Sequence, residues 1–155
     1  RYIFLLMRMV FFSLIEMMDV VTMRVPFPNI DSGLAAISHM YICMEKGPNN
    51  KQFVKCQTFK PDHLKPTTEP RKFVKEPGDP TRNPFKAPLN TIDCDKIFHI
   101  NNVTISSKLL TKPISNICQP LYQTISTCLN NNTVHSTNNV TVDVALLKHI
   151  NRLIT

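Results

Sequence analysis

The sequence predicts one small domain that is mainly β, with helix toward its C-terminal end, and three observations support this fold class. At 155 residues the chain has room for a single hydrophobic core. Short β-prone runs flank turn sequences that are rich in Gly, Pro and Asn. Apolar residues at helical spacings appear in the last third of the chain. We therefore expect an α+β domain in which the strands come first and a helix follows.

Residues 1–22 are strongly apolar, and we predict that they lie outside this domain as an N-terminal extension. A membrane-spanning helix needs about 20 consecutive apolar residues, but Arg8, Glu16 and Asp19 interrupt the run. The small-residue cleavage site of a signal peptide is also missing. The extension is then either an amphipathic surface helix or an upstream segment that is not native. We favour the second interpretation, because Met23 offers a start just before the first domain-like pattern.

The first part of the domain is expected to contain a strand and a hairpin. Residues 23–27 are the strand candidate, and the turn-forming residues 28–33 follow it. Residues 38–44 and 52–59 are β-prone runs on either side of 45–51, which contains Gly, Pro and Asn. Two such runs around such a turn predict a β-hairpin.

Residues 60–88 are predicted to form a long basic loop. Seven of the 12 prolines fall here, which excludes a continuous helix. Between Lys51 and Lys86, nine Lys or Arg residues stand against four Asp or Glu residues. Loops longer than about 15 residues are usually functional or disordered. The segment is therefore either a solvated linker or an extended basic flap over a substrate groove.

The last third of the chain is expected to hold one more strand, a short further strand at 103–105, and two helices. Residues 90–100 form the strand candidate. Residues 114–129 have apolar side chains on one helical face, and Pro120 is expected either to kink this helix or to delay its start. Residues 131–155 are predicted to be a polar linker and a short C-terminal helix. We therefore place the domain at residues 23–130.

The composition suits a polyanionic partner and disfavours common nucleotide sites. The formal net charge is +7, which fits nucleic acid, an acidic protein or a membrane surface, and equally a merely basic soluble protein. The chain has 3 Gly and no glycine-rich phosphate-binding motif. No C-x-x-C motif occurs, so neither a zinc ribbon nor a redox pair of that type is expected. We expect buried, reduced thiols rather than a disulfide framework at Cys43, Cys56, Cys94, Cys118 and Cys128.

Four segments, taken in order, resemble the MazF/PemK family of toxins, and in particular a divergent branch from low-GC Gram-positive bacteria. The segments are RVPFPNIDSGLAAISHMYIC, VKCQTFKP, RNPF and TIDCDKIF, and the resemblance covers roughly residues 23–130. It implies a small SH3-like β-barrel built from a strongly curved antiparallel sheet, with a C-terminal helix. It also implies a homodimer.

The resemblance further implies the toxin of a type II toxin–antitoxin system in the bacterial cytoplasm, with no role for a membrane. Members of the family cleave single-stranded RNA through attack of the 2′-hydroxyl, without a metal or another cofactor, and leave a cyclic phosphate. A cognate antitoxin protein, whose tail is expected to be acidic, blocks the RNA groove. This chemistry requires a base, an acid and donors that stabilise the crowded phosphate.

Three residues are candidate catalytic groups. Ser38-His39 stands where the family has Arg-Pro, and Thr58 stands where the family has the first residue of Thr-Ser. We expect His39 to transfer the proton, because imidazole titrates near working pH, and Thr58 to donate a hydrogen bond to the phosphate, with Ser38 beside them. Lys55 and Thr58 fall on opposite faces of a regular strand. The candidate RNA-binding residues are basic side chains in or after this strand, namely Lys55, Lys60, His63 and Lys65.

Two other interpretations stay open. The missing family arginine allows an inactive relative that binds RNA or a protein without cleaving it. Three N-x-S/T sequons, which begin at Asn102, Asn131 and Asn139, also allow a small secreted glycoprotein domain. The odd number of cysteines and the missing cleavage site weigh against secretion.

Overall fold

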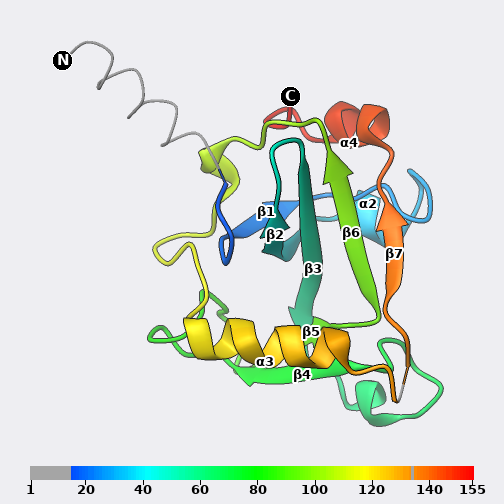
Figure 1. Ribbon diagram of the computed structural model, residues 1–155, viewed down its shortest axis with the longest axis vertical. Helices are drawn as coiled ribbons and strands as arrows, with labels where there is room; N and C mark the ends of the chain where they lie inside the picture. Colours follow the sequence, from blue (N-terminus) through cyan, green and yellow to red (C-terminus); the bar gives the residue numbers. More distant parts are fainter. Residues whose placement is uncertain (1–14, 134) are drawn as a thin grey trace.

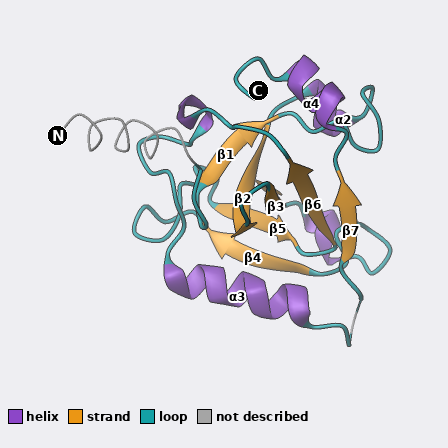
Figure 2. Cartoon of the chain, turned by 45° about the horizontal axis from the view of Figure 1, so that its top comes forward, coloured by secondary structure: helices purple, strands orange, loops and turns teal. Residues whose placement is uncertain are grey.

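The computed structural model describes residues 15–133 and 135–155, and these form one sheet with helices on two sides (Figures 1 and 2). The sheet has seven strands in the described chain. They are β1 (Val20–Met23), β2 (His39–Lys46), β3 (Asn50–Thr58), β4 (Phe73–Pro77), β5 (Leu89–Asp93), β6 (Lys96–Asn101) and β7 (Asn138–Thr141). The α-helices are α2 (Gly33–Ala36), α3 (Gln119–Asn130) and α4 (Val144–Ile150). This confirms the predicted mainly β fold with a helix near the C-terminal end.

Strand β3 is the centre of the sheet. Along one edge it pairs with β2, and along the other its first half pairs with β6 and its second half with β5. The strand order is β1-β2-β3-β5-β4, and β7 adds to β6. All pairs are antiparallel except β6 with β7, which is parallel. No ladder among the described strands joins β1 to β4, so the sheet is open along this path and the SH3-like barrel stays a prediction.

The two faces of the sheet carry separate hydrophobic cores. The α4-side core contains Tyr41, Phe53 and Phe98, with Leu147 of α4 packed among them. The α3-side core contains Ile42, Val54 and Ile92 of the sheet together with Leu121 and Ile125 of α3. Neighbours along each strand therefore enter different cores, as the side-chain alternation of a strand requires. From Met40 to Cys43, before the irregularity in the β2–β3 ladder, consecutive residues of β2 therefore face different parts of the molecule.

The structure corrects the predicted domain boundary at residue 22. Strand β1 covers Val20–Met23, so the strand predicted at 23–27 is wrong beyond Met23, and Val20 pairs with Ile42 of β2. Ile15 is also buried, with 1% of its surface exposed, in the α4-side core. Residues 15–22 thus belong to the folded domain. The surface helix considered for the N-terminal extension falls in 1–14, outside the described residues.

The predicted long loop at 60–88 is in large part ordered structure. It contains a 3₁₀ turn, Pro61–Leu64, and strand β4, which pairs with β5 from Phe73 to Pro77. Sequence patterning missed β4 because Pro77 ends it and because one of its two buried residues, Glu76, is charged, so apolar alternation is missing. The prediction of an extended flap is therefore wrong for residues 73–77.

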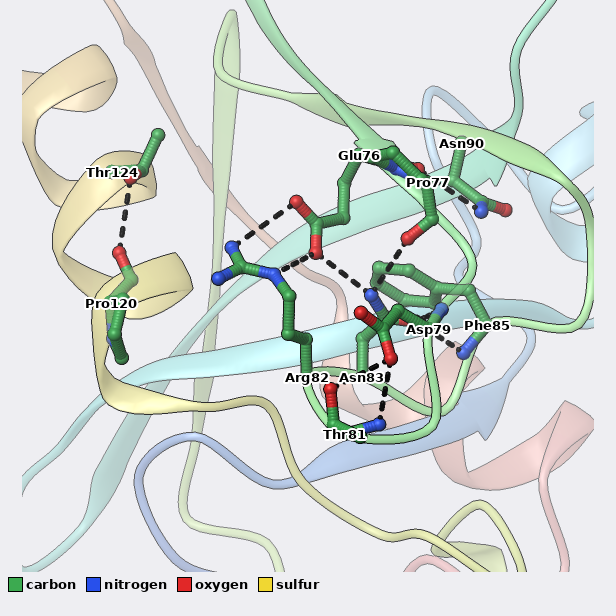
Figure 3. A network of polar contacts seen from close by, with 10 residues as sticks. All are labelled: Glu76, Pro77, Asp79, Thr81, Arg82, Asn83, Phe85, Asn90, Pro120 and Thr124. Carbon is green, nitrogen blue, oxygen red and sulfur yellow. Dashed lines mark hydrogen bonds and ion pairs between the residues drawn. The ribbon is translucent and has the colours of Figure 1, made fainter.

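The rest of this segment is held by a polar network that Figure 3 shows. Arg82 Nε donates to the Glu76 carboxylate at 3.0 Å, and Asn83 Nδ2 donates to the same carboxylate at 2.8 Å. Asn90 Nδ2 donates to the carbonyls of Glu76 and Ala87, at 3.3 and 3.0 Å. The carboxylate of Glu76 is buried and fully engaged, so residues 78–88 are fastened to the sheet rather than free.

The C-terminal third contains the two predicted helices and two strands that were not predicted. Helix α3 begins at Gln119 rather than at Ile114, and Pro120 lies in its first turn, where proline is tolerated, so of the two predicted effects of Pro120 the delayed start is the one observed. The single strand expected at 90–100 is two strands, β5 and β6, because Asp93 Oδ1 accepts a hydrogen bond from Asp95 N at 2.8 Å and turns the chain. The predicted polar linker contains β7, and α4 follows it. No helix in 15–133 or 135–155 has both the length and the apolar character needed to cross a membrane.

Candidate functional site

Two pockets lie on opposite sides of the sheet where β2 begins and β3 ends. The first, called the His39 pocket, has a volume of about 560 Å³ and is lined by His39, Lys55 and Asp93 among others. The second, called the Thr58 pocket, has a volume of about 630 Å³ and is lined by Ser38 and Thr58 among others. The structure therefore divides the three predicted catalytic residues between two sites. Ser38 and His39 are consecutive, so strand alternation sends their side chains to opposite faces.

The His39 pocket combines an apolar wall with a few convergent polar groups, which is typical of a ligand-binding site. Phe27, Ile37 and Phe98 supply apolar surface, and Lys55 and Asp93 supply charge. Strands β3 and β5 pair as Cys56 with Ile92 and Gln57 with Thr91. This register brings Lys55 of β3 level with Asp93 of β5. The predicted separation of Lys55 from Thr58 is confirmed, because the two side chains line different pockets.

The environment of the His39 pocket shifts the titration of its three main ionisable groups. Burial, and after it the charge of Lys55, lowers the pKa of His39. Burial raises the pKa of Asp93, against the opposing effects of the hydrogen bond from Asp95 and the charge of Lys55. Burial also lowers the pKa of Lys55. The imidazole thus favours its neutral form, and the carboxyl group holds its proton more tightly than in water, a combination that suits acid–base chemistry.

Three buried polar atoms of the described residues have no hydrogen-bond partner, and two of them belong to residues that line this pocket. Among the described residues these are Ser32 Oγ, His39 Nδ1 and the hydroxyl of Tyr41. Ser32 and His39 line the pocket. Tyr41 stands opposite Lys55 in the β2–β3 ladder, and its ring packs edge-on against Phe98, with the ring centroids 5.9 Å apart. Buried polar atoms are nearly always paired in folded proteins, so Ser32 Oγ and His39 Nδ1 leave hydrogen-bonding capacity beside the pocket that a polar ligand can use.

The Thr58 pocket has a different chemistry. Three lysines line it, Lys86 from the segment before β5 and Lys108 and Lys112 from the segment before α3. Hydroxyl groups of Ser38 and Thr58 add hydrogen-bond donors. Within the described chain its lining contains no Asp, Glu, His or Cys. The pocket can therefore hold a phosphate group by charge and hydrogen bonds, but it offers no side chain that exchanges protons near neutral pH.

The predicted RNA-binding residues beyond β3 differ in their exposure and in their contacts. His63 is 7% exposed, and its Nδ1 accepts from Lys60 N at 3.2 Å and lies 2.9 Å from Thr91 Oγ1. Because its ring is engaged in holding the 3₁₀ turn against β5, His63 has a structural role and we withdraw it from the binding set. Lys65 is exposed and forms an ion pair with Asp62 at 3.0 Å. Lys60 is exposed, and its charge contributes to the lowered pKa of His39.

Sequence reasoning missed Asp93 and the three lysines of the Thr58 pocket. Asp93 lies in the TIDCDKIF segment, but its partnership with Lys55 depends on the long-range pairing of β5 with β3. Lys86, Lys108 and Lys112 come from segments that meet only in the folded chain. No local spacing signal links any of these residues to the hairpin.

Comparisons of the chain with models of protein families, with curated proteins and with solved structures found no match. Among the described residues, no three His, Cys, Asp or Glu side chains lie close enough together to hold a metal ion.

Proposed function

We propose that the protein is an RNA-cleaving toxin of the MazF/PemK type, which binds single-stranded RNA at the open end of the β2–β3 hairpin and cleaves it in the His39 pocket. The observation that carries this proposal is the convergence of His39, Lys55 and Asp93 in one partly buried pocket, with the pKa of the imidazole lowered and that of the carboxyl group raised. The proposal includes the SH3-like barrel, the homodimer, the cytoplasmic location and the antitoxin partner that the resemblance implies.

The reaction is an internal transesterification that needs no metal. Neutral His39 takes the proton of the 2′-hydroxyl, and the 2′-oxygen then forms a bond to the adjacent phosphorus. The bond from phosphorus to the 5′-oxygen breaks, and the carboxyl group of Asp93 gives its proton to that oxygen. Lys55 stabilises the charge of the crowded phosphate. The products are a 2′,3′-cyclic phosphate and a free 5′-hydroxyl.

The Thr58 pocket has the complementary task of holding the RNA backbone. Lys86, Lys108 and Lys112 neutralise phosphates outside the cleaved bond, and such contacts position RNA without specifying its sequence. Exposed Lys60 lies just past the end of β3 and adds charge at the edge of the hairpin. A strand of RNA that passes over this end of the hairpin then reaches both pockets.

The test is an RNA cleavage assay with the full chain, a mixed-sequence RNA and EDTA, followed by mapping of the product ends. We expect 2′,3′-cyclic phosphate ends with the wild type. His39→Gln, which keeps a polar side chain of similar size, should lose about 100-fold or more in rate. His149→Gln is the matched control, because His149 is exposed on α4 and lines neither pocket. An unchanged rate in His39→Gln would overturn the assignment.

A second candidate function is RNA binding without cleavage, and the lysine-lined Thr58 pocket favours it, since binding there needs no acid–base group. The same assay distinguishes the two functions. Salt-dependent RNA binding by the wild type with no cyclic phosphate ends would support the binding module and contradict the enzyme.

A further inference from the structure

Two cysteines meet where helix α3 ends against the turn between β5 and β6. Cys94 is fully buried in that turn, and Cys128 is half-buried in the last turn of α3. Cys128 packs against the α3-side core that contains Cys94, and Cys94 Sγ donates to the carbonyl of Ile92 at 3.7 Å. The neighbouring backbone is tied together, because Thr137 Oγ1 lies 2.9 Å from the carbonyl oxygen of Cys94 and 3.0 Å from that of Leu129. The two cysteines thus lie at one junction, which the hydroxyl of Thr137 bridges.

A buried lysine completes this cluster. Lys72 is 5% exposed, and its Nζ donates to the carbonyls of Leu129 and Asn131 and to Thr137 Oγ1, at 3.3, 3.2 and 2.7 Å. It therefore caps the C-terminal end of α3, where the helix dipole favours a cation. The neighbouring Cys94 thiol, and after it the charge of Lys72, lowers the pKa of the Cys128 thiol, with burial opposing. The neighbouring Cys128 thiol, together with burial, raises the pKa of Cys94.

We infer that Cys94 and Cys128 are an oxidisable pair, in which Cys128 is attacked first by a peroxide and Cys94 then closes a disulfide. The thiolate of Cys128 attacks one peroxide oxygen, so that an S–O bond forms, the O–O bond breaks and water leaves. The sulfur of Cys94 then attacks the sulfur of Cys128, the S–O bond breaks, and the hydroxide takes the Cys94 proton and leaves as water. In sum, two thiols and one hydrogen peroxide give one disulfide and two waters.

The position of the pair distinguishes it from the other cysteines. Cys43 and Cys56 are buried in opposite cores, and burial raises the pKa of both thiols, so neither is readily ionised. Cys118 caps the start of α3, at the opposite end of the helix from Cys128, and is the control for a half-buried cysteine. Disulfide formation is therefore expected at one pair only.

The disulfide would act on the site proposed for RNA cleavage. Cys94 directly follows Asp93, whose carboxylate accepts the hydrogen bond that forms the β5–β6 turn. A bond from this turn to α3 would restrain or move the Asp93 side chain in the His39 pocket. This consequence rests on the proposed function, and it predicts slower RNA cleavage by the oxidised protein that a thiol reductant restores.

The test treats the full chain with hydrogen peroxide and measures intact mass and disulfide-linked peptides. We expect the loss of two hydrogens and a peptide that joins Cys94 to Cys128 in the wild type and in Cys118→Ser, and no such peptide in Cys128→Ser or Cys94→Ser. Alkylation of Cys128 by iodoacetamide in Cys94→Ala should also slow, because that variant has no side-chain donor beside the Cys128 thiolate. Linkage between other cysteines, or oxidation of Cys128 to higher acids with no disulfide, would overturn the inference.

Cleavage measured on the same samples keeps the two proposals separate. A Cys94–Cys128 disulfide in a protein that never cleaves RNA would support the thiol pair and contradict the enzyme. Cleavage without any such disulfide would support the enzyme and contradict the thiol pair.

Discussion

The His39 pocket and the Thr58 pocket are built on the same two strand ends and have similar volumes, but they contain different chemistry. The His39 pocket, on the side of the α4-side core, holds an imidazole, a carboxyl group and a half-buried lysine. The Thr58 pocket, on the other side of the sheet, holds three lysines and hydroxyl groups. The difference teaches that sequence neighbours such as Ser38 and His39 need not act together. In a strand, the partners of each residue are set by its face.

Replacement of the proposed acid should give the largest effect. Asp93→Asn keeps an oxygen that accepts the hydrogen bond from Asp95 N, so the β5–β6 turn should persist. It removes the proton donor, and the rate of RNA cleavage should fall by about 100-fold or more while RNA affinity changes little. Single-turnover cleavage and RNA binding by the variant check both parts. Asp31→Asn, at an exposed position outside both pockets, is the control and should keep the wild-type rate.

Loss of the lysines in the Thr58 pocket should mainly weaken binding. Combined replacement of Lys86, Lys108 and Lys112 by Met removes three phosphate contacts from this pocket. For single-stranded RNA the slope of log affinity against log salt should fall by about 2. Cleavage of bound RNA should change far less than binding does. Affinity measured over a range of salt concentrations tests this prediction.

A charge-matched control distinguishes the effect of the Thr58 pocket on RNA binding from the effect of the overall charge. Lys75→Met, Lys148→Met and Arg152→Met together remove the same charge from exposed positions that line neither pocket. An equal loss of salt dependence in this control would show that net charge, rather than the Thr58 pocket, holds the RNA.

His63 tests whether a predicted site residue is structural instead. His63→Ala leaves Thr91 Oγ1 and the backbone N–H of Lys60 without their ring partner, and the free energy of unfolding should fall by about 1–3 kcal/mol. Urea unfolding measures this change, and His149→Ala should stay close to the wild type. Loss of RNA affinity without loss of stability would instead restore His63 to the binding set.

The smallest effect expected is a shift in the titration of His39. The charge of Lys55 is the second cause of the lowered pKa of His39, after burial. Lys55→Met should therefore raise the pKa of His39 toward its ordinary value of 6.5, and Lys75→Met should not. An NMR titration of the imidazole measures both. Because the folded protein disfavours the charged imidazole, His39 should also make the fold less stable as pH falls below 6.5.

The parts of the fold that local signals specify were predictable. The turn residues at 47–50 indicated the β2–β3 hairpin, and Pro120 correctly delayed the start of α3. Strands β4 and β7 were missed because they are short and gain their stability from pairing with β5 and β6, which no local pattern encodes. The boundary at residue 22 was wrong because an apolar run was interpreted as an extension when part of it is the core strand β1.

The candidate site was predictable only in part, and for a related reason. Alternation along β3 correctly separated Lys55 from Thr58. The same alternation places the side chains of Ser38 and His39 on opposite faces. The two residues were nevertheless expected to act together, because they stand where the family has Arg-Pro. The position of Asp93 in the site depends on the register between β3 and β5. The positions of the lysines in the Thr58 pocket depend on the placement of two loops. Both arrangements depend on contacts between distant parts of the chain.

The most direct test of the account compares one variant from each pocket in the same single-turnover cleavage assay with EDTA. His39→Gln removes the proposed base, and Thr58→Val removes a hydroxyl from the other face while keeping the shape of the side chain. The account predicts that His39→Gln loses about 100-fold or more in rate with RNA still bound, and that Thr58→Val stays within about 10-fold of the wild type. Loss of cleavage in Thr58→Val with full activity in His39→Gln would contradict it and place the chemistry in the Thr58 pocket.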